Sequence, residues 1–421
     1  MSKPFEGDEL PERARAALGA RARDARTSWV PGRLEFLGKH TDYCGGPSLV
    51  CAVERGIAVV SAPRRDARVR ITDAMSGEHA DAELSDALVV RHGHWSSYPL
   101  TVCRRVVRNF PDARRGVDLA FASNLPPAAG LSSSSALIVA TFLALLDANE
   151  LAERADYRAA IRSTEDLAGY LGAVENGSSF GPLTGDSGVG TQGGSQDHTA
   201  ILCARPDALV QYAFAPIRFE GTTPLPDELR FVVAVSGVAA AKTGSALALY
   251  NRAASAAAAA LELWRAATGS MAPTLAAALA DAPNGMERCR RVLHGRDDLL
   301  RRVEQFAGEA AIVREAGEAL ARGDLDRVGG LVDESQANAE RLLDNQVPET
   351  IALARGAREL GAVAASAFGA GFGGSVYALV PTSRVEEFLD RWRTAYLTRF
   401  PGQRERATFF VTGAAAPAHA L

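Results

Sequence analysis

A glycine and serine segment constrains this chain most, because it joins a predicted strand to a strongly apolar predicted helix. The segment reads GLSSSSA at residues 130–136, after the predicted strand 116–122 and before the predicted helix 136–149. Small side chains let the backbone approach a polyphosphate, and the first turn of a helix offers unpaired N–H groups and positive dipole charge. The segment therefore predicts a phosphate site. A serine-rich cap of a core helix is an equally good interpretation of the segment alone.

A second glycine-rich segment reads GAGFGG at residues 369–374 and matches the letters GxGxxG. A dinucleotide-binding fold needs a strand before such a loop and a helix after it. We expect the reverse here, a helix over 349–365 before the loop and a strand over 375–380 after it. A glycine loop packed beside a bound triphosphate fits this context better, and a plain tight turn is the alternative.

A third segment, PGRLEFLGKHTDY at residues 31–43, is dense in ionisable groups. Arg33, Lys39, His40 and Asp42 fall within ten residues, a density that suits a site for a polyhydroxylated ligand. A solvated loop is the simpler interpretation of this segment by itself.

Hydrophobic periodicity gives a coarse map of the remaining elements. It predicts strands over 48–62, 67–72, 116–122, 199–203, 209–214, 229–236 and 375–380, and helices over 95–110, 136–149, 157–174, 245–267, 299–322 and 349–365. The segment 216–227 contains three prolines and a glycine, and it is the best candidate for a domain boundary. We expect two domains, 1–215 and 216–421.

Taken in chain order, the three segments resemble the three signature motifs of the GHMP small-molecule kinases. Residues 31–43 are similar to the galactokinase signature, usually written PGRxxxxGEHTDYxxG, and Trp95 and Tyr98 match its W-x-x-Y stretch. The resemblance implies an α+β fold with a ribosomal-S5-like N-terminal domain and a ferredoxin-like C-terminal domain. It also implies an enzyme that transfers the γ-phosphoryl group of ATP to a hydroxyl, expected at C1, of galactose or a related sugar.

The resemblance assigns roles to individual positions of this chain. The implied catalytic residues are Asp197 and Arg33, and the implied Mg²⁺ ligands are Ser134 and Glu175. The implied sugar-binding residues are Lys39, His40, Asp42 and Tyr250. The implied ATP-binding residues are Gly130, Leu131, Ser132, Ser133, Ser134 and Gly371. ATP and Mg²⁺ are therefore the expected cofactors.

Two departures from the family pattern affect these expectations. Galactokinases normally carry glutamate, which accepts a hydroxyl proton, where this chain has Lys39, and only three of its 46 basic residues are lysines. A lysine only donates, so an acidic sugar such as galacturonate is one hypothesis. The alternative is that Lys39 still contacts a neutral hexose or points away into solvent. The loop 178–194 is also longer than usual, either as a lid or, as we slightly prefer, as a surface excursion.

Composition excludes several other classes of protein. The formal net charge is −4, which argues against nucleic-acid or anionic-membrane partners, and no apolar run is long enough to cross a bilayer. Five scattered cysteines are typical of reduced thiols, so we expect a cytoplasmic monomer or weak dimer whose partners are a sugar and ATP. A non-catalytic sugar and ATP sensor is a further alternative, although the serine segment and Asp197 are intact.

Overall fold

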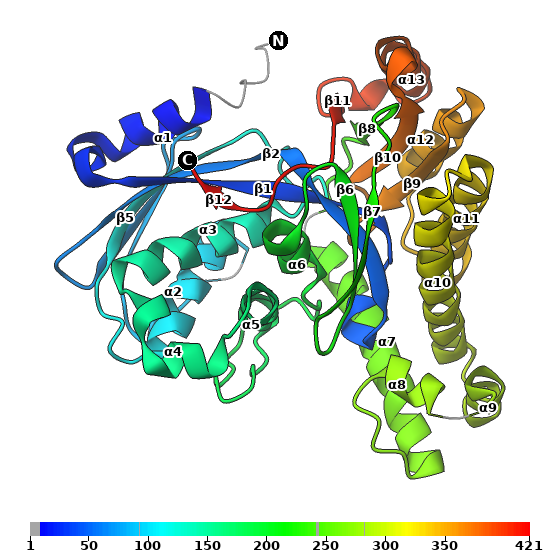
Figure 1. The fold of residues 1–421 in the computed structure, drawn as a ribbon, viewed down its shortest axis with the longest axis horizontal. Helices are drawn as coiled ribbons and strands as arrows, with labels where there is room; N and C mark the ends of the chain where they lie inside the picture. The colour runs from blue at the N-terminus through cyan, green and yellow to red at the C-terminus, as the bar shows by residue number, and fades with distance from the viewer. Residues whose placement is uncertain (1–8, 92, 241–243, 282) are drawn as a thin grey trace.

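Two β-sheets of unequal size, each covered by helices, form the two halves of the protein (Figure 1). The computed structural model describes residues 9–91, 93–240, 244–281 and 283–421. The mixed α+β class with two halves, expected from the resemblance, is confirmed. Among the residues so described, no helix combines the length and the apolar character that crossing a membrane requires.

The first sheet is organised around one long strand, β2 (Pro47–Pro63), which pairs with three others. Its order is β12-β1-β2-β5-β3-β4, with β6 on β2 and β7 on β6. The other strands are β1 (Arg26–Leu37), β3 (Arg68–Asp73), β4 (His79–Glu83), β5 (Val117–Ser123), β6 (Ala208–Ala213), β7 (Arg218–Pro224) and β12 (His419–Ala420). Among the strand pairs formed by the described residues, β3 and β5 alone are parallel.

Alternate residues of β2 pack on opposite faces of this sheet, as the period of two in a strand requires. Ala58 and Val60 pack under α1 (Glu9–Leu18), whereas Ile57 and Val59 belong to the main core. The helices on the main-core face are α2 (Ser97–Asn109), α3 (Ser133–Ala148), α4 (Ala155–Ala160), α5 (Thr164–Asn176) and α6 (Gln196–Cys203), which lie below the sheet in Figure 1.

The second sheet is antiparallel and has the order β11-β8-β10-β9. Its strands are β8 (Leu229–Val235), β9 (Ala364–Phe368), β10 (Ser375–Pro381) and β11 (Thr408–Thr412). One face packs against α12 (Pro348–Glu359) and α13 (Val385–Arg399), with Trp392 at the centre of that cluster. The residues that alternate with this set, among them Phe231 and Tyr377, join the main core instead.

The two halves share that core through aromatic side chains. Phe36 on β1 lies 6.1 Å from Phe231 and 5.3 Å from Tyr377 between ring centroids. The Tyr377 hydroxyl donates to the Phe36 carbonyl at 2.7 Å, in a buried position. The motif strand β1 is therefore fixed to both sheets.

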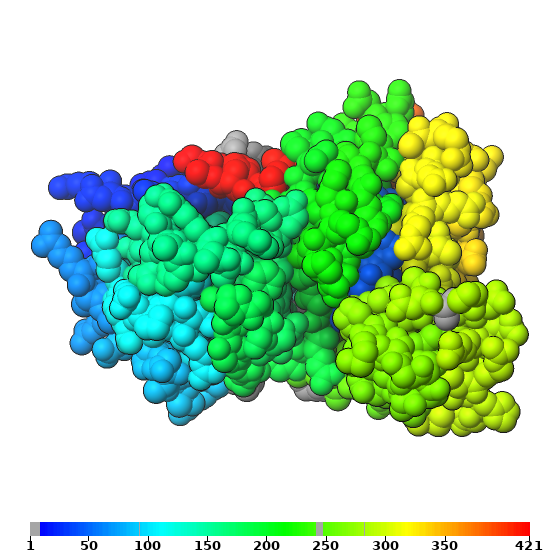
Figure 2. Space-filling model, turned by 60° about the horizontal axis from the view of Figure 1, so that its bottom comes forward, coloured from blue at the N-terminus to red at the C-terminus, as the bar shows by residue number. Residues whose placement is uncertain are grey.

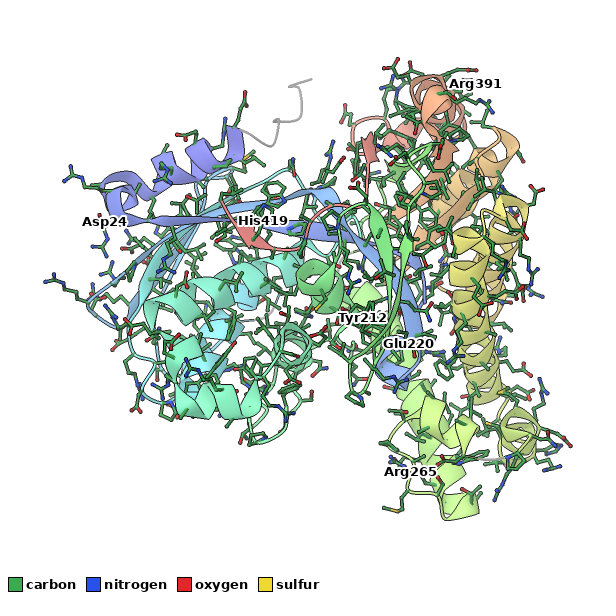
Figure 3. All side chains as sticks on the ribbon, in the orientation of Figure 1. Asp24, Tyr212, Glu220, Arg265, Arg391 and His419 are labelled. Atoms are coloured by element: carbon green, nitrogen blue, oxygen red, sulfur yellow. The ribbon has the colours of Figure 1, made fainter. Side chains whose placement is uncertain are left out.

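Helices α7 (Gly244–Thr268), α8 (Leu275–Ala280), α9 (Gly285–Val292) and α10 (Asp297–Ala321) extend beyond the two sheets, and α11 (Leu325–Asn338) returns beside α10. Figure 2 shows α8 and α9 as a projecting lobe. Trp264 of α7 is buried in a cluster that joins the lobe to α7 and α10, and Arg265, labelled in Figure 3, donates to the carbonyl of Ala272 at 3.0 Å. A small hydrophobic core thus fastens the lobe to its neighbouring helices.

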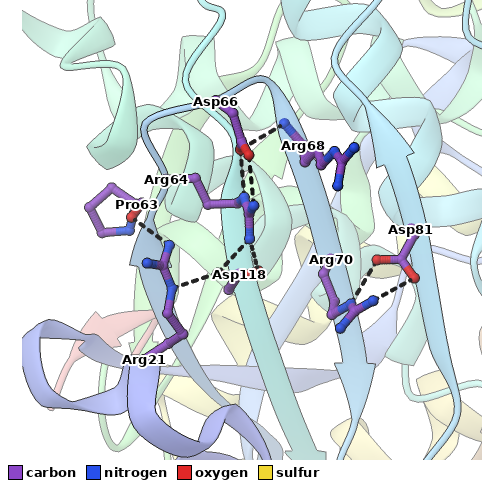
Figure 4. Close-up of polar contacts among 8 residues, drawn as sticks. All are labelled: Arg21, Pro63, Arg64, Asp66, Arg68, Arg70, Asp81 and Asp118. Carbon is purple, nitrogen blue, oxygen red and sulfur yellow. Dashed lines mark hydrogen bonds and ion pairs between the residues drawn. The ribbon is translucent and has the colours of Figure 1, made fainter.

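A network of ion pairs fastens the N-terminal segment to the first sheet (Figure 4). Asp118 on β5 accepts from Arg21 at 2.8 Å and from Arg64 at 2.9 Å. Arg64 also pairs with Asp66 at 2.6 Å, and its hydrogen bonds hold the pKa of the Asp66 carboxyl well below its usual range. Exposed pairs such as Arg70 with Asp81 each contribute little to the free energy of folding. The role of this network is therefore to orient the N-terminal segment on the sheet.

Most of the predicted elements are present, and three predictions are wrong. Residues 199–203 belong to helix α6 rather than to a strand. The helix predicted over 157–174 is two helices, because Ser163 caps α5 by accepting from the Asp166 N–H at 3.1 Å. The glycine segment 369–374 follows strand β9 rather than a helix, so it is the turn of the β9–β10 hairpin.

The first sheet continues past the predicted division at residues 215 and 216. Strand β7 pairs with β6, as the neighbouring labels Tyr212 and Glu220 in Figure 3 illustrate. The end of the chain also returns to this sheet, where His419 of β12 lies opposite Trp29 of β1. Sheet membership therefore places the change from one half to the other between Pro224 and Leu229.

The shared aromatic contact generates a stability prediction. Replacing Phe36 by alanine leaves a cavity between the two sheets and is expected to lower the free energy of unfolding by about 3–5 kcal/mol. Chemical denaturation followed by circular dichroism measures this change. The control is Val89→Ala, because Val89 is 81% exposed and its replacement is expected to change stability by no more than about 0.5 kcal/mol. Equal effects of the two changes would contradict the role given to Phe36.

Candidate active site

Arg33 on β1 is the side chain that joins the signature segment 31–43 to the serine segment and to helix α6. Its Nε donates to Asp197 Oδ1 at 2.8 Å, and its Nη1 donates to the Gly130 carbonyl at 2.5 Å. Its backbone N–H donates to the carbonyl of Leu131 at 3.2 Å. Burial alone lowers the pKa of the guanidinium, but the carboxylates of Asp197 and Glu35 raise it above its ordinary value. Arg33 therefore remains a cation inside the protein.

The Asp197 carboxylate lies at the first turn of α6, beside a chain of polar groups. Ser135 Oγ lies 3.4 Å from Asp197 Oδ2 and donates to Glu175 Oε2 at 2.8 Å. His198 Nε2 is 3.3 Å from the same Glu175 oxygen. The last turn of α5, the first turn of α3 and the first turn of α6 thus meet at one point.

An enclosed cavity surrounds these groups and collects most of the predicted catalytic and sugar-binding residues. Six predicted residues line it: Arg33, His40, Asp42, Glu175, Asp197 and Tyr250. Its free volume is about 30 Å³, which is enough to hold water between these polar groups.

His40 is held neutral inside a directional chain of hydrogen bonds. The Tyr43 hydroxyl lies 2.8 Å from its Nδ1 and accepts from Arg302 Nη2 at 3.0 Å, so Nδ1 is the acceptor. Nε2 then carries the proton and faces the Ala370 carbonyl at 3.2 Å. Burial, followed by the cation of Arg302, lowers the pKa of His40 to about 3. Arg302 also donates to the His40 carbonyl at 2.6 Å.

Asp42 fixes the opposite wall of the cavity. One carboxylate oxygen accepts from the backbone N–H of Tyr43 at 2.9 Å, and the other accepts from the N–H of Gln196 at 3.2 Å. A Cβ atom at Gly194 would lie 2.5 Å from Asp42 Oδ2, so only glycine permits this approach. The contact places Asp42 beside the start of α6.

A second cavity of about 510 Å³ adjoins the first. Its apolar wall includes Trp95, Tyr98 and Phe121, and the predicted residues Gly130, Ser132, Ser133 and Ser134 form its polar end. Arg33 and Ala370 line both cavities. An aromatic pocket ending at a helix N-terminus has the shape and chemistry of a nucleotide site.

The serine segment adopts the geometry that an anion site needs. Ser132 precedes α3 in the left-handed region, with a φ of 60°, and its buried Oγ has no hydrogen-bond partner among the described residues. The N–H groups of the first helical turn have no acceptor within the helix, because a helix leaves them free. Leu131 differs from the prediction: its side chain is in the core, and its carbonyl positions Arg33.

The glycine loop 369–374 contributes differently from the prediction. A Cβ atom at Gly369 would lie 3.1 Å from the Gly130 carbonyl, so this loop and the serine segment are packed back to back. Gly369 and Ala370 line the cavities, whereas Gly371 packs on Asn345, 2.4 Å from where a Cβ would stand. Gly371, which is predicted to bind ATP, therefore lines neither of these two cavities, whereas its two predecessors do.

Lys39 lies away from the cavity, contrary to its predicted sugar contact. It is almost fully buried, and its Nζ donates to Ser335 Oγ at 2.8 Å. The same hydroxyl reaches the Glu309 carboxylate at 2.8 Å, and Glu309 also accepts the N–H of Gly38 at 2.8 Å. Lys39 thus joins the signature segment to helices α10 and α11 of the other half.

The long loop 178–194 lies against the first half and does not project as a lid or a free excursion. Asp186, in the middle of this loop, pairs with Arg104 of α2 at 2.8 Å and is almost fully buried. Asn176 Nδ2 donates to the Gly193 carbonyl at 2.8 Å and positions the end of the loop. That end supplies Thr191 and Gly194 to the cavity wall.

Among the site residues that were missed from the sequence, three carry polar side chains close to the predicted catalytic groups. Ser135 and His198 are next to predicted residues and showed no signal of their own beyond that position. Glu35 also lines the cavity, and its signal was available: residues two apart on a strand share a face, and Arg33 is two residues away.

The residues present fit a magnesium ion held mainly by phosphate and water. Mg²⁺ in such sites takes one or two protein oxygens. Glu175 offers a carboxylate beside Asp197, and Ser134 offers a hydroxyl at the start of α3, on the wall of the adjoining cavity. Within the described ranges, no group of three or more His, Cys, Asp or Glu side chains is arranged to hold a metal.

Three family models match separate parts of the chain. The galactokinase galactose-binding signature matches residues 18–63, the GHMP kinase N-terminal domain matches 97–179 and the GHMP kinase C-terminal domain matches 317–397. The galactokinase of Roseiflexus sp. (strain RS-1) is 29% identical over 377 residues, which cover 87% of this chain and 86% of that protein. The galactokinase of Chloroflexus aurantiacus is 27% identical over 388 residues, covering 89% of this chain and 88% of the other.

Solved structures agree with this fold. Lactococcus lactis galactokinase complexed with galactose superposes with a TM-score of 0.81 at 22% identity, covering 96% of this chain and 97% of that one. The Methanococcus jannaschii mevalonate kinase superposes with a TM-score of 0.58 at 13% identity, covering 94% of this chain and all of the other. At these identities the likeness concerns the fold.

The buried, doubly hydrogen-bonded ring of His40 predicts a specific pH dependence. Because its pKa is lowered from its ordinary value to about 3, it should stay neutral from pH 8 to pH 5. Unfolding exposes a ring that binds a proton below about 6.5, so this contribution to stability is complete above that pH and is lost as the pH falls toward 3. Histidine NMR signals, assigned with His40→Gln, measure it. A His40 titration midpoint near 6.5 would contradict the assignment.

Proposed function

We propose, from the premise that this chain is a galactokinase-like GHMP kinase, that it transfers the γ-phosphoryl group of ATP to a hydroxyl of galactose, expected at C1. The single observation that carries the proposal is the position of Arg33. It bridges the Gly130 carbonyl of the serine segment and the Asp197 carboxylate, and it lines both adjoining cavities.

The chemistry of phosphoryl transfer fits this arrangement. The reaction needs in-line positioning and charge stabilisation more than covalent participation by the protein. The free N–H groups at the start of α3 would hold the phosphates, with the nucleotide base in the aromatic cavity near Trp95 and Tyr98. The acceptor sugar would lie in the cavity beside Asp197, so the seam between the cavities is where the phosphoryl group crosses.

Asp197 would accept the proton of the attacking hydroxyl. Arg33 holds one carboxylate oxygen at 2.8 Å, which fixes the orientation of the group and favours its charged form. The same guanidinium would stabilise negative charge on the moving phosphoryl group. One cation therefore serves both the base and the transferred group.

Ser134 and Glu175 would hold the Mg²⁺ ion that accompanies ATP. The ion, when bound, neutralises charge on the β- and γ-phosphates. Glu175 is already oriented for this task, because Ser135 donates to one of its oxygens and His198 lies beside the same oxygen.

Galactose is favoured over galacturonate as the acceptor. The acidic-sugar hypothesis depended on a lysine facing the substrate, whereas Lys39 Nζ donates to Ser335 among buried residues of the other half. The relatives described above carry the name galactokinase, which favours the neutral sugar. A sensor that binds without turnover is separated from the kinase by ADP release.

The first functional prediction concerns Asp197. Replacing it by asparagine keeps the size of the group but removes the base, so turnover of galactose is expected to fall at least about a hundredfold. The turnover of Arg33→Ala is expected to fall to a similar extent, because the change releases the Asp197 carboxylate and removes the guanidinium charge. A coupled assay for ADP release measures both.

The matched control is Asp112→Asn, because Asp112 is an exposed aspartate of the same half that lines neither cavity. Its turnover is expected to equal that of the natural chain. Thermal unfolding of every variant checks that the fold is retained. Near-normal turnover in folded Asp197→Asn would overturn its assignment as the base.

The second functional prediction concerns Lys39. The natural chain is expected to prefer galactose to galacturonate in kcat/KM, and Lys39→Met is expected to keep that preference. The same change should lower the Tm, because the buried Glu309 carboxylate then loses the lysine cation to which Ser335 connects it by hydrogen bonds. Kinetics on the two sugars and a thermal melt measure the two effects. A preference for galacturonate that Lys39→Met abolishes would reverse this conclusion.

A further inference from the structure

Glu35 lies on β1, two residues after Arg33, and is directed into the cavity that contains Asp197. Its side chain is 2% exposed, so solvent does not hydrate it. The neighbouring residues of the strand, Leu34 and Phe36, belong to the hydrophobic core instead. The position of Glu35 therefore follows from strand alternation and is as fixed as that of Arg33.

The Oε1 atom of Glu35 is buried and has no hydrogen-bond partner among the residues that the structure describes. Nearly all buried polar atoms in proteins are hydrogen-bonded, and an unpartnered carboxylate oxygen is strongly destabilising. Burial also raises the pKa of Glu35 to about 7, although Arg33 and Lys39 lower it. An unpartnered acceptor of this kind, on a side chain that lines the cavity, indicates a ligand that supplies the missing donor.

The neighbouring charges do not explain why a carboxylate is buried at position 35. Besides its own burial, the strongest influences on Glu35 are the cations Arg33 and Lys39 and the carboxylates Glu309 and Asp197. Arg33 pairs directly with Asp197, and Lys39 reaches Glu309 through Ser335. Each of these cations thus has a carboxylate already, and Glu35 is an additional carboxylate without a cation of its own among the described residues.

We propose that Glu35 is a sugar-binding residue whose Oε1 accepts a hydrogen bond from one hydroxyl group of the acceptor sugar. This inference rests on the function proposed above. It assigns to Glu35 a specificity role, because a site built to receive a hydroxyl rejects an analogue that lacks it.

The other polar groups on the wall make this role distinctive. Both ring nitrogens of His40 already face Tyr43 and Ala370, and both carboxylate oxygens of Asp42 accept backbone N–H groups. Lys39, which offers no acceptor, points into the other half. Glu35 therefore supplies acceptor capacity that the fold itself does not use.

The test combines Glu35→Met, which has a similar volume but no acceptor, with galactose and its 2-, 3-, 4- and 6-deoxy analogues. For galactose, kcat/KM is expected to fall about ten- to a hundredfold, the range of a hydrogen bond to a charged group. The natural chain should disfavour one deoxy analogue by a similar factor. On that analogue alone, Glu35→Met and the natural chain should become nearly equal, while the KM for ATP stays unchanged.

A thermal melt without sugar separates this role from a structural one. Removing a buried, unpartnered carboxylate is expected to leave the Tm unchanged or to raise it, as at sites that retain a destabilising group for function. Glu54→Met is the matched control, because Glu54 is exposed on the adjacent strand β2 and should change neither the analogue pattern nor the Tm. A lower Tm with equal losses on every analogue would overturn the assignment and indicate a structural role.

Binding separates failure of this inference from failure of the proposed function. Galactose should raise the Tm of the natural chain and should raise that of Glu35→Met less. Turnover with an unchanged analogue pattern in Glu35→Met would overturn the role of Glu35 alone. A natural chain that neither turns over nor binds any of these sugars would overturn both proposals.

Discussion

The contact between Arg33 and Asp197 is the interaction on which the site depends. A guanidinium with only 4% of its side chain exposed must find partners inside the protein, because an isolated buried charge is prohibitively unstable. It finds them on two segments at once, the Asp197 carboxylate of α6 and the Gly130 carbonyl before α3, and the backbone N–H of Arg33 donates to the neighbouring Leu131 carbonyl. Satisfying one side chain therefore brings the serine segment and the candidate base to a common point on β1.

Contacts between the two halves of the protein hold this point in place. Phe36 and Tyr377 fasten β1 to the second sheet on one side, and Arg302 of α10 holds the carbonyl of His40 on the other. The signature segment 31–43 is thus held by residues more than 250 positions away in the chain. Such support matters for phosphoryl transfer, because the reaction depends on atoms being held in line rather than on a covalent step.

Three carboxylates of the cavity differ because their surroundings differ. Asp197 is paired with a guanidinium, Glu175 is hydrogen-bonded by Ser135 and flanked by His198, and the Oε1 of Glu35 has no partner among the described residues. Groups of one chemical type can serve as base, metal ligand and sugar acceptor when their environments separate them. The surroundings of each carboxylate, rather than its residue type, therefore determine which role it can take.

The amino-acid sequence alone predicts the fold class, about half of the strands and helices, and the three segments that meet. Local signals suffice for these features: the run rich in valine and alanine over 48–62, the alternation along 67–72, the apolar run after the serines, and the motif residues themselves. It misplaced 199–203, because a short apolar run has no period that separates a strand from a helix. The three-dimensional structure alone shows that Lys39 turns to Ser335, that Gly371 rests on Asn345 and that Glu35 lines the cavity with an Oε1 atom that has no partner among the described residues. The direction in which a side chain points depends on which distant elements offer it a partner, and no local pattern records that choice.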